Sequence, residues 1–175
     1  MAVTEGAIEV VIEIPRGSRN KYEFDHDRNV IRLDRRLFSA TAYPADYGFV
    51  PDTLAQDGDP LDALVLVEDP TFPGCHVVAR PVAVFWMTDE KGPDAKIICV
   101  PSHEPRWDGV SDLDQLPAGL MGEIRHFFDI YKDLKPGKET STKGYEGRSA
   151  ALTEIADSRR RYDASSPALL RGGPQ

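Results

Sequence analysis

The sequence predicts a fold of the α+β class, mainly β, built as a small closed barrel with two helices. Short apolar segments separated by turn residues fill the first part of the chain, which favours a barrel over a parallel sheet. Apolar residues then recur at helical spacing in two segments of the last third. No repeat or linker divides the chain. We therefore expect one domain over residues 1–164, followed by a mobile tail over residues 165–175.

The expected strands begin close to the N-terminus. Residues 7–15 alternate between an apolar face and a face that carries two glutamates. A turn separates residues 22–25 from residues 30–34, so these segments predict a hairpin or meander. Further apolar segments predict strands at residues 63–67, 77–87 and 95–100. Between the last two strands, residues 89–94 contain Gly92 and Pro93 and predict a connecting loop.

The last third of the chain has the periodicity of helices. From residue 117 to about residue 133, apolar residues recur at three- and four-residue spacing, which predicts an amphipathic helix. A second helix is predicted after Gly147, where Leu152, Ile155 and Tyr162 have similar spacing.

Composition and charge narrow the classes of function. A chain of 175 residues with 41% hydrophobic and 29% charged residues is typical of a globular protein. Its formal net charge of -8 would repel a nucleic-acid backbone, so no nucleic-acid partner is expected. An acidic chain can still handle a polyanionic substrate if its carboxylates hold cations and those cations hold the substrate.

The sequence also carries signals about location. No apolar run approaches the roughly 20 residues that a membrane span needs, and the N-terminus lacks a secretory pattern. We therefore expect no membrane partner and a cytoplasmic location. Cys75 and Cys99 both lie among apolar residues and are expected to be reduced core residues.

The most informative pattern is the acidic segment at residues 57–62. Asp57, Asp59 and Asp62 lie on a loop bent by one glycine and one proline, and the loop runs directly into a predicted buried strand. Carboxylates this dense need a counter-charge, and hard oxygen ligands suit Mg²⁺, Mn²⁺ or Ca²⁺ better than zinc. A solvated acidic turn remains the alternative.

A second acidic segment, residues 89–96, could complete a site for several metals. Alone it is typical of an ordinary hairpin turn. Cations about 4 Å apart need several bridging carboxylates, and the two acidic loops together with Glu13 and Glu23 could supply them.

Several cationic and aromatic residues complement these carboxylates. Lys21, Arg35, Lys96 and Lys132 lie beside aromatic or strand residues rather than on long polar faces. Alternation places Arg35 on the side of apolar neighbours, which predicts an anionic partner. That partner is either a structural carboxylate or a phosphate. Tyr47 is expected either to pack in the core or to donate to a phosphate oxygen.

The assembled segments closely resemble the family I soluble inorganic pyrophosphatases, particularly the short bacterial form. The matching stretches occur in order and cover most of the chain: residues 10–15, 21–23, 43–48, 57–62, 87–96 and 126–134. The resemblance implies a five-stranded OB-like closed barrel flanked by two helices and assembled as a homohexamer. It also implies an inorganic diphosphatase of phosphate metabolism, a phosphoric anhydride hydrolase that uses several Mg²⁺ ions per active site, with Mn²⁺ or Zn²⁺ as substitutes.

The resemblance further implies roles for the carboxylates at matching positions. Asp57, Asp62 and Asp94 would bind the first activating metal, and Asp62 would bridge to a second. Asp89 and Asp94 would bind metals that arrive with the diphosphate, and these ions would be supported by Glu13 and Glu23.

Catalytic and substrate-binding roles are implied in the same way. Asp59 matches the general base that activates a metal-bound water, and Asp94 is a competing assignment. The positions that match phosphate-binding residues are Lys21, Arg35, Tyr47, Tyr131 and Lys132, with Lys96 nearby.

Two other functions remain open from the residues alone. The first is a non-catalytic barrel that binds divalent metal and phosphate. The second is an OB-type nucleic-acid binder, which the acidic balance and the lack of an aromatic-basic strand face disfavour.

Overall fold

The structure, a computed structural model, describes residues 6–137 and 140–165. The predicted tail therefore lies outside the described residues except for Ser165, the last residue of helix α2. Two short 3-10 helices, Pro105–Trp107 and Leu113–Gln115, precede α1. The main elements are β1 Ile8–Ile14, β2 Asn20–Asp25, β3 Val30–Arg36, β4 Asp46–Phe49, β5 Asp62–Val65, β6 His76–Asp89, β7 Gly92–Pro101, α1 Ala118–Ile130, β8 Ser141–Gly147 and α2 Arg148–Ser165.

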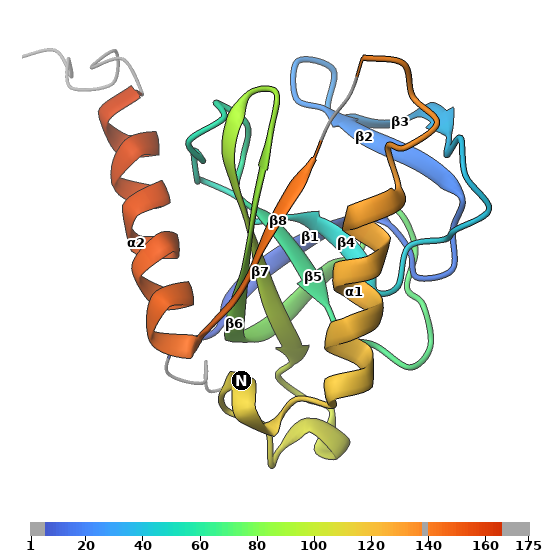
Figure 1. The fold of residues 1–175 in the computed structure, drawn as a ribbon. Coiled ribbons are helices and arrows are strands. Elements are labelled where there is room, and N and C mark those ends of the chain that lie inside the picture. The colour runs from blue at the N-terminus through green and yellow to red at the C-terminus, as the bar shows by residue number, and fades with distance from the viewer. Residues whose placement is uncertain (1–5, 138–139, 166–175) are drawn as a thin grey trace, which may run out of the picture.

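Five of these strands close into a ring in the order β1-β4-β5-β7-β6, because β1 also pairs with β6. The pairings are antiparallel except for β5 with β7. Strand β8 extends the sheet outside the ring, on β6. Strands β2 and β3 form a separate hairpin, as predicted. The five-stranded closed barrel with two flanking helices is confirmed, and Figure 1 shows α1 and α2 on opposite sides of it.

Two apolar clusters pack against the two faces of the barrel strands. Neighbouring residues alternate between them: Val84 and Ile97 belong to one cluster, and Phe85 and Ile98 to the other. Fully burying such a side chain contributes about 1.5–3 kcal/mol. The helices complete the clusters with one apolar stripe each, which comprises Met121, Ile124, Phe127 and Phe128 of α1, and Ala151 and Ile155 of α2.

The predicted loop at residues 89–94 was wrong in extent. Strand β6 continues to Asp89 and β7 starts at Gly92, so only two residues form the turn. The β6–β7 ladder reaches the pair Asp89↔Gly92. Gly92 has a φ of 118°, which only glycine adopts without strain, so the chain can reverse there. Gly92 and Pro93, which predict a loop from the sequence, instead pair with Asp89 and Thr88 at the start of β7.

The helix predictions are confirmed to within a few residues. Helix α1 covers Ala118–Ile130, inside the predicted span, and α2 starts directly after Gly147. Strands β4 and β8 were not predicted. Cys99 is a buried core residue, as expected, but Cys75 is only half-buried, and both cysteines are free. Within the described residues, no helix is long and apolar enough to span a membrane.

Candidate active site

Every site residue predicted from the sequence lines one cavity of about 470 Å³. These side chains come from several strands, loops and turns of the chain. They are Glu13 on β1, Lys21 and Glu23 on β2, Arg35 on β3, Tyr47 on β4, Asp57 and Asp59 on the loop before β5, Asp62 on β5, Asp89 on β6, Asp94 and Lys96 on β7, and Tyr131 and Lys132 after α1.

A buried lysine organises the barrel wall of this cavity. Lys96 is 2% exposed, and strand register places it beside Asp62 of β5. Its Nζ lies 2.8 Å from Asp62 Oδ2 and 2.9 and 3.0 Å from the two oxygens of Asp94. The Tyr47 hydroxyl donates to the same Asp62 oxygen over 2.6 Å and accepts from Lys96 over 3.2 Å. The ammonium also lies 5.2 Å from the centre of the Phe128 ring. Together these groups form a compact polar centre inside apolar surroundings.

Burial raises the pKa of three carboxylates in this cavity, those of Glu13, Asp57 and Asp94. It raises the pKa of Asp94 to about 6, although nearby Lys96 acts in the opposite direction. It raises the pKa of Glu13 to about 7, against the lowering effect of the Phe24 N–H, which donates to that carboxylate over 2.7 Å. Burial and the neighbouring aspartates also raise the pKa of Asp57. Burial alone would lower the pKa of Lys96, but Asp62 and Asp94 outweigh it and raise that pKa.

The donor set fits a hard divalent cation. Its members are carboxylate oxygens whose negative charge is only partly compensated, so an added cation would relieve their desolvation and mutual repulsion. Across residues 6–137 and 140–165, no three His, Cys, Asp or Glu side chains stand close enough together to form a metal cluster. Lysines contact these carboxylates instead, namely Lys96 on Asp62 and Asp94, Lys91 on Asp59, and Lys132 on Asp89.

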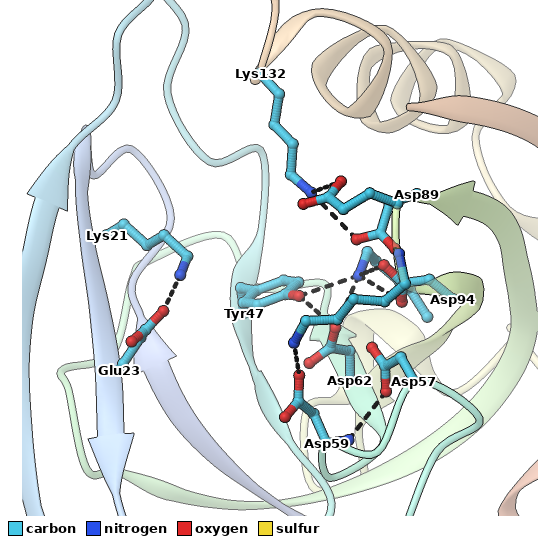
Figure 2. Close-up of polar contacts among 12 residues, drawn as sticks. Lys21, Glu23, Tyr47, Asp57, Asp59, Asp62, Asp89, Asp94 and Lys132 are labelled. Atoms are coloured by element: carbon cyan, nitrogen blue, oxygen red, sulfur yellow. Dashed lines mark hydrogen bonds and ion pairs between the residues drawn. The ribbon is translucent and has the colours of Figure 1, made fainter. Parts of the chain in front are cut away.

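The loop that carries Asp57 and Asp59 is tightly folded. Asp57 Oδ1 accepts from the Asp59 N–H over 3.1 Å, and the Ala55 N–H donates to the Asp59 carbonyl over 2.8 Å. Gly58 allows this with a φ of 91°. The side chain of Asp59 is 60% exposed at the cavity mouth, where it pairs with Lys91 of the β6–β7 turn at 2.7 Å. Figure 2 shows Asp57, Asp59 and Asp62 close together on one side of Tyr47.

The β2–β3 hairpin forms the facing wall. Lys21 pairs with Glu23 and, at 3.3 Å, with Asp34. Arg35 pairs with Asp34, so the predicted anionic partner exists within the protein. The apolar neighbours expected beside Arg35 do not form a core, because Leu33 is 60% exposed. In Figure 2, Lys21 and Glu23 stand across the cavity from the aspartates.

The turn after α1 contributes the third wall. Lys132 lies 3.2 Å from Asp89 and 3.9 Å from Glu90. Burial would lower the pKa of Lys132, but Tyr131 and Asp89 raise it overall. The Tyr131 ring stacks on Phe127 at 5.3 Å, which fixes this turn against α1.

Several further residues line the cavity, none of which was given a role of its own from the sequence. Lys91 and Lys135 add positive charge, Glu90 adds negative charge, and His26 packs edge-on against Phe24 at 4.8 Å. In the sequence, Lys91 could have been recognised as a site residue from its position in an acidic turn between two predicted strands. Nothing in local periodicity marks Lys135 or His26.

The chain is similar in sequence and in fold to known proteins of one family. The family model described as inorganic pyrophosphatase matches residues 10–163. An inorganic pyrophosphatase of Streptomyces coelicolor is 54% identical over 154 residues, which cover 88% of this chain and 94% of that protein. One of Methanosarcina acetivorans is 53% identical over 161 residues, or 91% of this chain and 95% of the relative. The crystal structure of inorganic pyrophosphatase from Thermus thermophilus has a TM-score of 0.88 at 47% identity and covers 93% of this chain and 97% of that one.

Proposed function

This chain belongs to the inorganic pyrophosphatase family, and from that premise we propose that its cavity hydrolyses diphosphate to two phosphates with a metal-activated water. The reaction is that of an inorganic diphosphatase, a phosphoric anhydride hydrolase. One observation carries the proposal: a single cavity of about 470 Å³ combines a wall of clustered aspartates with cationic side chains on the facing walls. Such a cavity can hold cations and a small polyanion together.

Mg²⁺ is the proposed cofactor, with several ions per site and Mn²⁺ or Zn²⁺ as substitutes. Asp57, Asp62 and Asp94 would hold the first ion and Asp62 would share a second. Asp89 and Asp94 would hold ions that accompany diphosphate, with Glu13 and Glu23 in support. When bound, such ions neutralise phosphate oxygens and lower the pKa of a coordinated water.

Asp59 is the proposed general base. Its side chain reaches into the cavity mouth from a backbone held by the Asp57 and Ala55 hydrogen bonds. The competing candidate, Asp94, has both oxygens within 3.0 Å of the Lys96 ammonium, so each already accepts a hydrogen bond. An exposed carboxylate can take a proton from water and release it to solvent, which favours Asp59.

The cationic walls are proposed to hold and neutralise the phosphates. Lys21 and Arg35 approach from the hairpin, and Tyr131 and Lys132 from the turn after α1. Negative charge accumulates on the leaving phosphate during the displacement, so fixed donors at Arg35, Tyr131 and Lys132 stabilise the transition state more than the ground state. Water is the nucleophile, so the mechanism needs no covalent intermediate.

The decisive experiment measures phosphate release from diphosphate with Mg²⁺, with Mg²⁺ plus chelator, and with Ca²⁺. We expect rapid release that depends on Mg²⁺, inhibition by Ca²⁺, and little release from ATP. Ca²⁺ bonds to oxygen are longer and their geometry is looser, so the attacking water would be misplaced. Binding of diphosphate without phosphate release would instead support a non-catalytic metal and phosphate module.

We also propose that the protein assembles as a homohexamer and acts in the cytoplasm. Exposed apolar side chains such as Phe38, Phe72 and Leu134 offer surface that subunit contacts would cover. The two free cysteines are compatible with a reducing compartment. Light scattering of the purified protein measures the assembly directly.

A further inference from the structure

Helix α2 packs against the rest of the protein through apolar contacts and through buried polar contacts. In its first half, the apolar residues Ala151 and Ile155 pack in one of the core clusters. Three polar residues that lie three or four positions apart along the helix also face the interface, namely Glu154, Ser158 and Arg161, which we call the α2 clamp. Ser158 is fully buried and Glu154 nearly so. Polar groups are costly to bury without hydrogen-bond partners. The partners of these three residues therefore indicate which part of the protein the helix holds in place.

The partners of the α2 clamp are one another and the backbone of a single loop. Arg161 donates to Glu154 over 2.6 Å and to the Ser158 hydroxyl over 2.9 Å. Its Nε donates to the carbonyl of Leu54 over 2.8 Å. The Leu54 N–H in turn donates to the Ser158 carbonyl over 3.0 Å. Both backbone groups of Leu54 are therefore held by α2, and the bond from Arg161 spans 107 residues of sequence.

Leu54 begins the turn that presents Asp57 and Asp59 to the cavity. The next residue, Ala55, donates to the Asp59 carbonyl over 2.8 Å and accepts from the Gly58 N–H over 3.2 Å. On its other side, the loop is held by Thr53, whose hydroxyl accepts from Leu61 over 2.9 Å. In Figure 1 this teal segment lies between α2 and the β6–β7 hairpin. A short chain of hydrogen bonds thus connects the clamp to the two aspartates.

We propose that Arg161 is a positioning residue that fixes Asp57 and Asp59 through the backbone of residues 54–58. The inference rests on the proposed function for its catalytic consequence. Its structural basis is independent of that function, because the clamp engages loop backbone and no cavity side chain. The residues proposed to bind phosphate lie on the β2–β3 hairpin, on β4 and after α1, and none of the hydrogen bonds that Arg161 donates within the described chain reaches them.

The test compares Arg161→Met with Arg160→Met. The control residue is the next one on the same helix, but its side chain is 74% exposed and pairs with Asp157. For Arg161→Met we expect kcat to fall about 10- to 100-fold, because a small displacement of a reacting group has effects of this size. The Mg²⁺ concentration for half-maximal rate should rise, while KM for diphosphate should stay within about twofold. Arg160→Met should match the wild type in all three quantities.

Arg161→Lys separates positioning from stability. Lysine keeps the charge but donates from a single nitrogen atom. It therefore cannot donate to both Leu54 and Glu154 in the way that the planar guanidinium does. We expect an intermediate kcat with a melting temperature close to that of the wild type. If kcat follows the melting temperature across the variants, or if kcat and KM change together, the residue is only structural and the inference is wrong.

Amide hydrogen exchange in chelator gives a second readout that does not need the active enzyme. Arg161→Met should speed exchange at Leu54, Ala55 and Gly58 by about tenfold or more, while the amide of Val84 in β6 stays unchanged. Unchanged exchange in the loop would overturn the inference even if kcat falls. A wild-type protein that releases no phosphate would refute the proposed function instead, and the exchange comparison would still decide whether the clamp holds the loop.

Discussion

The barrel wall and the hairpin wall of the cavity differ in how firmly the fold holds their side chains. On the barrel wall, Asp62, Asp94 and Lys96 project from paired strands of the closed ring and share several buried hydrogen bonds. On the hairpin wall, Lys21 and Arg35 project from a two-stranded sheet that pairs with no other strand in the described chain. Their ion pairs are within the hairpin and partly exposed.

This difference corresponds to what each kind of ligand requires. Mg²⁺ needs near-ideal octahedral geometry, and four of its six proposed carboxylates lie on strands of the ring, namely Glu13, Asp62, Asp89 and Asp94. A phosphate group accepts hydrogen bonds over a wide range of directions, so its proposed partners can come from elements that adjust. The contrast predicts that a change at a buried barrel residue alters stability, that a change at the exposed Asp59 alters turnover alone, and that a change at Lys21 on the hairpin alters substrate affinity alone.

The largest expected effect tests whether an exposed residue on the barrel side follows this rule. Asp59→Asn should lower kcat by about 10²–10⁴-fold, because it removes a proton acceptor but keeps the shape. Its side chain makes one exposed ion pair, with Lys91, so the melting temperature and diphosphate binding should change little. Steady-state kinetics measures kcat, isothermal titration measures diphosphate binding, and thermal melting measures stability. A near-normal rate here, combined with an inactive Asp94→Asn, would transfer the role of base to Asp94.

The next effect compares two lysine–aspartate contacts within the same cavity. Lys96→Met leaves Asp62 and the buried Asp94 without their cation, so unfolding free energy in chelator at pH 8 should fall by about 3–5 kcal/mol. Lys91→Met removes an exposed pair with Asp59 and should cost less than about 1 kcal/mol. Urea denaturation gives both values. Equal losses in the two variants would contradict the distinction between the buried and exposed parts of the cavity.

The barrel side was also the part best predicted from the sequence. Residues 63–67 are a continuous apolar run and residues 97–100 are a shorter one, so their strands and the aspartates beside them were expected. Strand β4 is only four residues long, and β8 has a mixed polar sequence with two glycines, so neither shows a clear alternation. These strands form through pairing with neighbours that are distant in sequence, which local patterns do not record.

The resemblance placed the site residues at one cavity, but the sequence could not give their pairing. Lys96 was expected near the substrate and does line the cavity, and strand register also buries it against Asp62 and Asp94. That register depends on the parallel pairing of β5 with β7. The contacts of Arg161 with Leu54 were likewise beyond sequence patterns, because they join a helix to a loop 107 residues earlier.

A smaller effect should appear in the response of stability to Mg²⁺. Millimolar Mg²⁺ should raise the melting temperature by about 5–10 °C, the equivalent of about 2.7 kcal/mol at a hundredfold excess over Kd. Asp62→Asn should remove most of this rise, because Asp62 is the proposed bridge between two ions. Glu9→Gln is the control, since that residue lies on β1 but pairs with His76 away from the cavity. Equal shifts in the wild type and Asp62→Asn would mean that this carboxylate holds no metal.

The smallest effect should come from the hairpin wall and should appear in KM. Lys21→Met removes one charged donor from the cavity, so KM for diphosphate should rise about tenfold, the equivalent of about 1.4 kcal/mol. Because the hairpin stands outside the ring, kcat and the melting temperature should stay near the wild-type values. Arg32→Met is the matched control on the same hairpin: Arg32 pairs with Asp25 and does not line the cavity. A fall in kcat as large as the rise in KM would show that Lys21 acts on the transition state. The hairpin would then be as closely tied to catalysis as the barrel wall is.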